Sequence, residues 1–247
     1  LSGLVGSEMF IRDRFWDWAS LFQEHGGAVG RTPEQYASFR RALHDTMDLW
    51  YSHAGITKYL LTALPAGTPA SVRTYDDRGW CFFERSSAQL CTPTKAGGMY
   101  WPMVVDVGAG LDGGAATRAP PLLPADFDAQ VKQRKFTNGA DMEVVSALYR
   151  QTVDNVLGNT EALKWGGMDL SDGARIARVR AVLQANYPIR ILQLYKCRID
   201  DEGAKALAEA LDGEVLFTLE GHGDGVLSLI HISEPTRPER IACAGVG

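Results

Sequence analysis

Apolar side chains recur at helical spacing in three stretches of the chain. The first begins at Thr32, with Pro33 at the first helical position and Gln35 placed for a capping box. Its apolar stripe consists of Tyr36, Phe39, Leu43, Met47 and Trp50. Residues 78–90 and 141–157 show the same three- and four-residue steps, and Gly158 and Asn159 supply a stop after the third stretch, which places Val144, Leu148 and Val156 on one face. These patterns predict three helices.

Two apolar runs are short enough to be strands. Residues 56–64 are β-branched and apolar and end at Pro65, and residues 99–107 form a second run in which Pro102 favours an edge or a bulge. The alternation of helix and strand predicts a small α/β module over residues 15–107. The Gly-, Ala- and Pro-rich residues 108–125 then predict a linker or a long loop before the segment 126–226.

The stretch "IRILQLYKCRIDDEGAKALAEAL" (189–211) has a pattern of its own. Its apolar positions are Ile189, Leu192, Leu194, Cys197 and Ile199. This spacing resembles the LxxLxLxx(N/C)xL pattern of leucine-rich repeats, and the helix that follows resembles the ribonuclease-inhibitor type. The resemblance implies that Leu192 and Leu194 point inward from a strand. Small Ala204 and Ala208 then let a helix approach that strand closely.

An upstream stretch, "WGGMDLSDGARIARVRAVL" (165–183), repeats the helix half of this unit. Gly173 and Ala174 precede Gly203 and Ala204 by thirty positions, whereas the strand half of the upstream copy looks degenerate. "VLFTL" (215–219) starts a further copy. We therefore expect a helix followed by a partial leucine-rich repeat, a strand–helix solenoid, over residues 126–226. Such units need at least about three copies for stability, so we also expect the source protein to continue.

A possible chemical signature lies in "YDDRGWCFFE" (75–84), which follows an apolar run and opens a predicted helix. It resembles the Y..(S/R).WC..E segment of TIR-like domains and, more loosely, the R.W..QE segment of fungal heterokaryon-incompatibility (HET) domains. The resemblance implies that Glu84 is a catalytic carboxylate acting on NAD as substrate, with Trp80 and Cys81 as the neighbouring signature. Gly79 stands where the TIR pattern has serine. A carboxylate beside an oxocarbenium-like ribosyl centre can stabilise positive charge or activate water.

A structural interpretation of the same residues competes with the catalytic one. Trp80 and Phe83 would be core, Cys81 a small buried residue, and Glu84 an ion-pair partner of Arg78 or Arg85 on the helix surface. Taken together, the segment, the loop and the repeats resemble a large family of protist proteins without an established activity. We expect an interaction protein that binds a protein partner through its repeats, rather than an enzyme. The alternative is a TIR-like NAD nucleosidase or signalling enzyme.

Composition, charge and cysteine spacing indicate in which compartment the protein works and which classes of partner it binds. The chain is 45% hydrophobic with a formal charge of −5, so no global basic field favours nucleic acid or an anionic membrane. No apolar run approaches the roughly 20 residues of a membrane helix. Cys81, Cys91 and Cys197 show no metal-type spacing. We expect reduced thiols, an intracellular and cytoplasmic location, and no metal or bound cofactor; the oligomeric state stays open.

The two ends of the chain are related to each other. Back-translation of "LSLIHISEPTR" (227–237) and reverse complementation give, in a shifted frame, the stretch "LVGSEMFIRDR" (4–14), with Phe10 where Cys is expected. Both stretches resemble a translated sequencing adapter. We therefore expect residues 1–14 and 227–247 to be adapter-derived, which leaves Phe15 to Val226 for fold reasoning.

Overall fold

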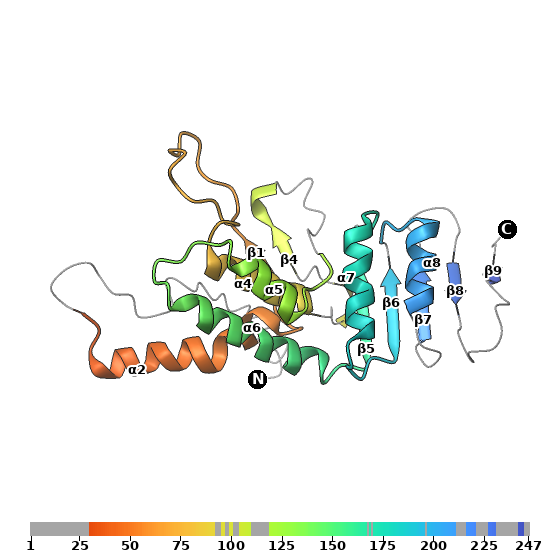
Figure 1. The fold of residues 1–247 in the computed structure, drawn as a ribbon, viewed down its shortest axis with the longest axis horizontal. Coiled ribbons are helices and arrows are strands. Elements are labelled where there is room, and N and C mark those ends of the chain that lie inside the picture. The colour runs from red at the N-terminus through yellow and green to blue at the C-terminus, as the bar shows by residue number, and fades with distance from the viewer. Residues whose placement is uncertain are drawn as a thin grey trace, which may run out of the picture. The chain divides into compact units, whose positions relative to one another are not determined.

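The structure is a computed structural model that describes residues 30–91, 95–96, 99–100, 104–109, 119–166, 168, 170–195, 197–210, 216–220, 227–230 and 242–244 (Figure 1). The chain forms two compact units, residues 1–47 and residues 48–247. The expected adapter-derived segment 1–14 lies outside the described residues, as does most of 227–247.

The described part of the first unit, residues 30–47, holds most of the helix predicted to start after Thr32, and residues 48–52 of that helix belong to the second unit. Helix α2 spans Pro33–Arg41 and continues through a π-helical turn, η2 (Ala42–Thr46), into α3 (Met47–Ser52). The predicted capping box is present: the Gln35 amide donates to the Thr32 hydroxyl at 3.3 Å, and the Thr32 amide donates to Gln35 Oε1 at 3.0 Å. Two backbone donors that would otherwise lack partners are thereby satisfied.

The second unit begins with a parallel strand–helix–strand arrangement. Strand β1 (Lys58–Leu60) pairs in parallel with β4 (Val104–Asp106), and α4 (Gly79–Leu90) lies between them in sequence. The predicted strand 56–64 is shorter than expected, because residues beyond Leu60 leave the ladder and Leu61 is 65% exposed. The helix over 78–90 is confirmed, with Phe83 and Leu90 fully buried.

The second predicted strand, 99–107, is divided. Strand β3 (Met99–Tyr100) pairs antiparallel with β2 (Lys95–Ala96), while β4 covers the other end and leads into the 3-10 turn η3 (Val107–Ala109). Residues 101–103, including Pro102, lie outside the described residues. Within the expected linker 108–125, Pro120, Pro121 and Leu122 are buried.

Two helices then connect this arrangement to the rest of the unit. Helix α5 (Pro124–Val131) was not predicted from the sequence. Helix α6 (Asp141–Leu157) confirms the predicted helix, which stops at Gly158. Its buried face differs from the expected stripe of Val144, Leu148 and Val156. That face is formed by Val145, Leu148, Tyr149, Thr152, Val153 and Leu157.

Aromatic rings fill the space among α4, α5 and α6. Phe127 of α5 stacks on Phe82 of α4 and on Tyr149 of α6, with ring centroids 5.0 Å and 3.9 Å apart. The Tyr149 hydroxyl donates to the Leu122 carbonyl at 2.8 Å. One aromatic stack therefore joins the strand–helix–strand arrangement to α6.

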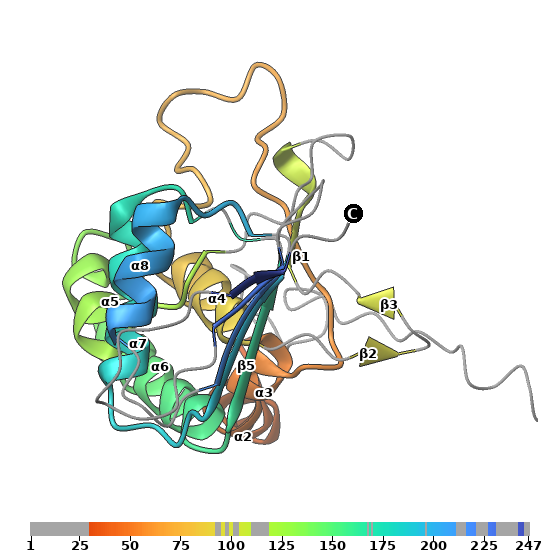
Figure 2. The same cartoon turned by 90° about the vertical axis from the view of Figure 1, so that its right-hand side faces the viewer.

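The remainder of the unit alternates strand and helix around one sheet. Strands β5 (Ala162–Gly166), β6 (Ile191–Tyr195) and β7 (Leu216–Glu220) are parallel neighbours, with α7 (Gly173–Gln184) and α8 (Asp201–Ala210) between them in sequence. Helices α6, α7 and α8 lie along one face of these strands (Figure 2). Strands β8 (Leu227–Ile230) and β9 (Ala242–Ala244) extend the sheet in antiparallel order.

The register of β5 and β6 reveals a strand that sequence analysis judged degenerate. Leu163 pairs with Leu192 and Trp165 with Leu194, an offset of 29 residues, and all four side chains are fully buried. The same offset continues beyond the strands. Met168 precedes Cys197 by 29 residues, both side chains are buried, and the Arg198 amide donates to the Met168 carbonyl at 2.9 Å. The upstream stretch therefore forms a strand, β5, although its sequence matches the repeat pattern poorly.

Candidate functional site

Polar side chains gather at the carboxyl ends of the parallel strands β1 and β4. Asp106 is the last residue of β4 and is only 7% exposed. One of its carboxylate oxygens accepts hydrogen bonds from the Thr62 hydroxyl and, at 3.0 Å, from the Gly108 amide. In parallel α/β arrangements, the edge at the carboxyl ends of the strands is where ligands are usually bound. This edge is therefore the first candidate site.

Arg85 joins α4 to this edge. Its guanidinium lies 2.9 Å from the Asp76 carboxylate and 3.5 Å from the Asp106 carboxylate, and its central carbon is 5.2 Å from the centre of the Tyr75 ring. Two carboxylates share one arginine, so the arginine's charge is already matched by anions of the protein. Arg85 is consequently suited to positioning Asp106 and the loop before α4, rather than to binding an anionic group.

Glu84 precedes Arg85 on the same helix and is half-buried. The Tyr75 hydroxyl donates to Glu84 Oε2 at 3.4 Å. Burial raises the pKa of Tyr75 above its ordinary value, and the negative charge of Glu84 raises it further. Tyr75 therefore stays a neutral hydrogen-bond donor to Glu84.

The two neighbours in the TIR-like segment have structural contacts. The Trp80 indole donates to the Asp141 carboxylate at 3.1 Å, which ties α4 to the start of α6. Its ring also packs edge-on against Phe83, with centroids 6.1 Å apart. Cys81 is half-buried. Phe83 is fully buried, as the structural interpretation expects, whereas Trp80 and Cys81 are only half-buried, so the expectation that these two belong to the core was wrong.

Gly79, where the TIR pattern has serine, is explained by its surroundings. A Cβ at this position would lie 1.9 Å from Cζ of Phe136. The backbone is held in place as well, since the Gly79 amide donates to the Lys135 carbonyl at 3.0 Å and the Lys135 amide donates to the Asp77 carbonyl at 2.8 Å. The Phe136 ring therefore occupies the volume that a serine side chain would need.

The second candidate site is the face of β5 and β6 opposite the helices, which we call the open face. It carries the side chains of Ala162, Lys164, Ile191 and Gln193, which alternate with the buried ones. Lys164 is exposed, and its register partner Gln193 is half-buried. In the register between the strands, Ala162 and Ile191 form an apolar row beside this polar one. The backbone of β7 continues both rows.

The sequence pointed to Glu84, to Tyr75 as the first residue of the matched segment and to Arg85 as a surface ion-pair partner, but not to Asp106. A signal was present for Asp106, because an acidic residue that ends an apolar run and is followed by Gly108 typically lies at a strand end. Nothing in the sequence indicated that the arginine next to Glu84 would reach that strand.

Comparison of the chain with protein-family models, with curated proteins and with solved structures found no match. Among the described residues, no group of three or more His, Cys, Asp or Glu side chains could hold a metal ion. No helix within the described residues is both long enough and apolar enough to cross a bilayer.

Proposed function

We propose that this chain is an intracellular, cytoplasmic protein-interaction protein that binds a protein partner on the open face of its parallel sheet. In this proposal, residues 126–226 form a helix followed by truncated leucine-rich repeats, and the strand–helix–strand arrangement before them is a small α/β module. The observation that carries the proposal is the in-register pairing of β5, β6 and β7, with the described helices α6, α7 and α8 along one face of these strands.

The open face suits a protein partner because it is extended and carries both apolar and polar side chains. Its apolar row of Ala162 and Ile191 offers surface to bury, and the adjacent Lys164 and Gln193 offer hydrogen-bond donors and acceptors. Parallel strands repeat the same side-chain positions at intervals of about 4.8 Å. Side chains from several successive units can therefore contact one partner at once, which is how repeat proteins bind.

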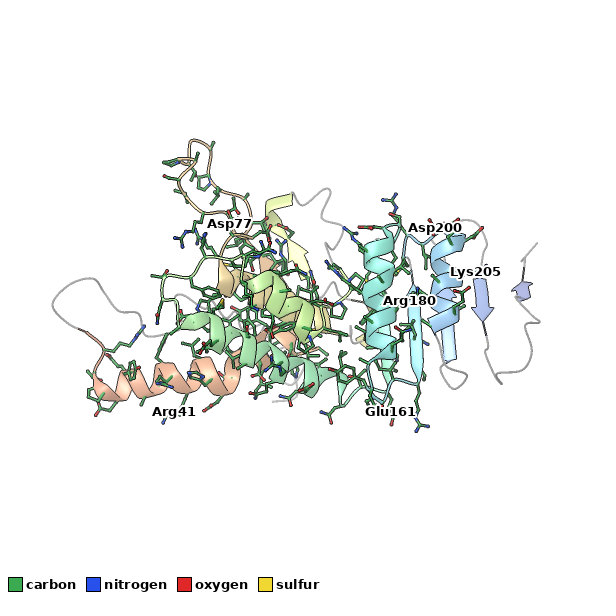
Figure 3. The ribbon with its side chains drawn as sticks, in the orientation of Figure 1. Arg41, Asp77, Glu161, Arg180, Asp200 and Lys205 are labelled. Carbon is green, nitrogen blue, oxygen red and sulfur yellow. The ribbon has the colours of Figure 1, made fainter. Side chains whose placement is uncertain are left out.

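Matched variants on the two faces of the sheet test this proposal. Lys164→Glu and Gln193→Arg alter the open face, whereas Lys205→Glu changes the same kind of charge on α8, on the helix side (Figure 3). Partners captured by the unaltered chain in cells are identified and then measured against each variant. We expect the open-face pair to weaken binding at least tenfold and Lys205→Glu to leave it unchanged. The proposal fails if the helix-side variant abolishes binding or the open-face pair leaves it intact.

A second function, hydrolysis of NAD by a TIR-like module, is supported by the position of Glu84. This carboxylate lies in α4 beside Arg85, which reaches the carboxyl end of β4, and it accepts a hydrogen bond from a neutral Tyr75. In this alternative Glu84 stabilises the positive charge that develops on the ribosyl carbon as nicotinamide leaves, or activates the attacking water.

The two functions are separated by a turnover measurement. The chain is incubated with NAD, and nicotinamide and ADP-ribose are quantified for the parent, for Glu84→Gln and for Glu143→Gln, an exposed glutamate on α6. Turnover that only Glu84→Gln reduces, by a factor of about 100 or more, supports the nucleosidase. Absence of turnover in the parent removes this second function and leaves the binding proposal untouched.

A further inference from the structure

A lysine and a cysteine meet in the interior of the second unit, away from both candidate sites. Lys58, the first residue of β1, is 6% exposed, and Cys91, directly after α4, is 1% exposed. The Lys58 Nζ lies 3.0 Å from the Cys91 Sγ and donates to the His53 carbonyl at 2.7 Å. A buried amine and a buried thiol are thus held against each other across 33 positions of sequence.

The surroundings fix both reactive atoms. The Cys91 thiol lies 3.5 Å from the Tyr51 carbonyl, which it can donate to while its sulfur accepts from the lysine. Cys91 packs into a small apolar cluster with Leu60, Ala88 and Val104. Buried lysine is uncommon because its charge must be compensated by hydrogen bonds, and here one of its acceptors is a sulfur atom. No packing requirement of the apolar cluster calls for an amine at this point.

We propose that Lys58 and Cys91 form a redox-modification site in which an oxidised Cys91 is captured by the lysine amine. A peroxide is the oxidant. In the first step the thiol and hydrogen peroxide give a sulfenic acid and water, and the sulfur loses two electrons to the peroxide. In the second step the Lys58 nitrogen, after release of a proton from the ammonium, forms a bond to sulfur. The sulfur–oxygen bond breaks, and the departing hydroxide takes a second proton from nitrogen and leaves as water.

The product is a covalent N–S bond between β1 and the end of α4. The starting separation of 3.0 Å lies in the range of about 3–3.5 Å from which reacting atoms proceed directly to bond formation. Two equivalents of an added thiol restore both side chains and are converted to a disulfide. Peroxide reaches the pair through local opening, because β1 is a three-residue strand whose described pairing is with β4 alone. The modification therefore locks a strand that is otherwise held by few hydrogen bonds.

The test is peptide mapping of the full, folded chain after treatment with hydrogen peroxide. Trypsin cuts after Arg41, Lys58, Arg73, Arg78, Arg85 and Lys95 in this region. We expect peptides 42–73 and 86–95 to be recovered joined, uncut at Lys58 and lighter by two hydrogens than their sum. Dithiothreitol should separate them.

Three controls make the outcome decisive. Half-buried Cys81, in the separate peptide 79–85, reports that the oxidant was effective. The same treatment in guanidinium should give no joined peptides, since the reaction depends on folded geometry. In Lys58→Arg, which keeps the positive charge, Cys91 should proceed to sulfinic acid. Sulfinic acid at Cys91 in the parent chain, a reduced Cys91 beside an oxidised Cys81, or equal joining in guanidinium overturns the proposal.

Discussion

Replacement of Phe127 by leucine tests whether the aromatic stack holds α4, α5 and α6 together. The Phe127 ring is fully buried and lies within 18° of parallel to Phe82 and within 17° of parallel to Tyr149. Each aromatic pair contributes about 0.5–1.5 kcal/mol beyond its buried area. Loss of two pairs removes about 1–3 kcal/mol, and imperfect repacking of leucine adds up to about 1.5 kcal/mol. We expect the free energy of unfolding to fall by about 1–4.5 kcal/mol.

Urea denaturation followed by circular dichroism and by tryptophan fluorescence measures this change. A double-mutant cycle with Phe82→Leu isolates one pair, and its coupling energy should be about 0.5–1.5 kcal/mol. Tyr59→Leu serves as the matched control, because this ring is 66% exposed and its loss should stay within about 0.5 kcal/mol. If Phe82→Leu and Phe127→Leu add within about 0.3 kcal/mol, the two rings do not interact and the reasoning is refuted.

Three further predictions use the same denaturation measurement. Gly79→Ser should cost about 1–3 kcal/mol, because its Cβ would force the Phe136 ring out of place; an unchanged stability would show that this ring moves freely. Trp165→Phe should change stability by less than about 1 kcal/mol, whereas Trp165→Ala should cost about 3–5 kcal/mol. The fully buried Nε1 of Trp165 has no hydrogen-bond partner in the part of the chain that the structure describes, so phenylalanine loses no hydrogen bond at this position. If Trp165→Phe costs as much stability as Trp165→Ala, Nε1 does have a hydrogen-bond partner. Burial raises the pKa of Tyr149, so the unfolded chain ionises near pH 10 while the folded chain keeps a neutral phenol. The stability from this group is therefore present below about pH 10 and is lost as the pH rises, and Tyr149→Phe should flatten that alkaline decline relative to the parent. An identical decline in both proteins would contradict it.

Local signals in the sequence were sufficient for several helices. The capping box of Thr32 and Gln35 acts over three residues, so its geometry follows from local sequence and is present as predicted. The spacing of aromatic and apolar residues over 78–90 likewise predicted α4. Its buried residues Phe83 and Leu90 lie about two helical turns apart. Such features depend on neighbours a few positions away, which is why the sequence alone determines them.

Features that depend on packing were predicted less well. The stripe of α6 was placed partly on Val144 and Val156, while the buried face includes Tyr149, whose hydroxyl finds the distant Leu122 carbonyl. The strand 162–166 was missed because Trp165 occupies a position where the repeat pattern has leucine, so its periodicity was recognisable only through its pairing with β6.

The surroundings of Glu84 show the same limit. Tyr75 lies nine positions earlier and Asp106 lies on another strand, and both are brought to α4 by the parallel pairing of β1 with β4. A resemblance can suggest which carboxylate carries the chemistry. It cannot indicate that the adjacent Arg85 is already matched by Asp76 and Asp106, which is decided by the tertiary fold.

The spacing of strands and helices explains why the open face is a suitable binding surface. Adjacent strands lie about 4.8 Å apart, whereas packed helices lie about 8–10 Å apart. A row of helices on one face is therefore wider than the strands beneath it, and the sheet must bend with its strands on the inner side. Small residues reduce this mismatch: a Cβ at Gly203 of α8 would lie only 3.1 Å from Cδ1 of Ile176 on α7. Close helix approach thus moderates this mismatch, and under the proposed binding function the shape of the open face depends on residues that the partner does not touch.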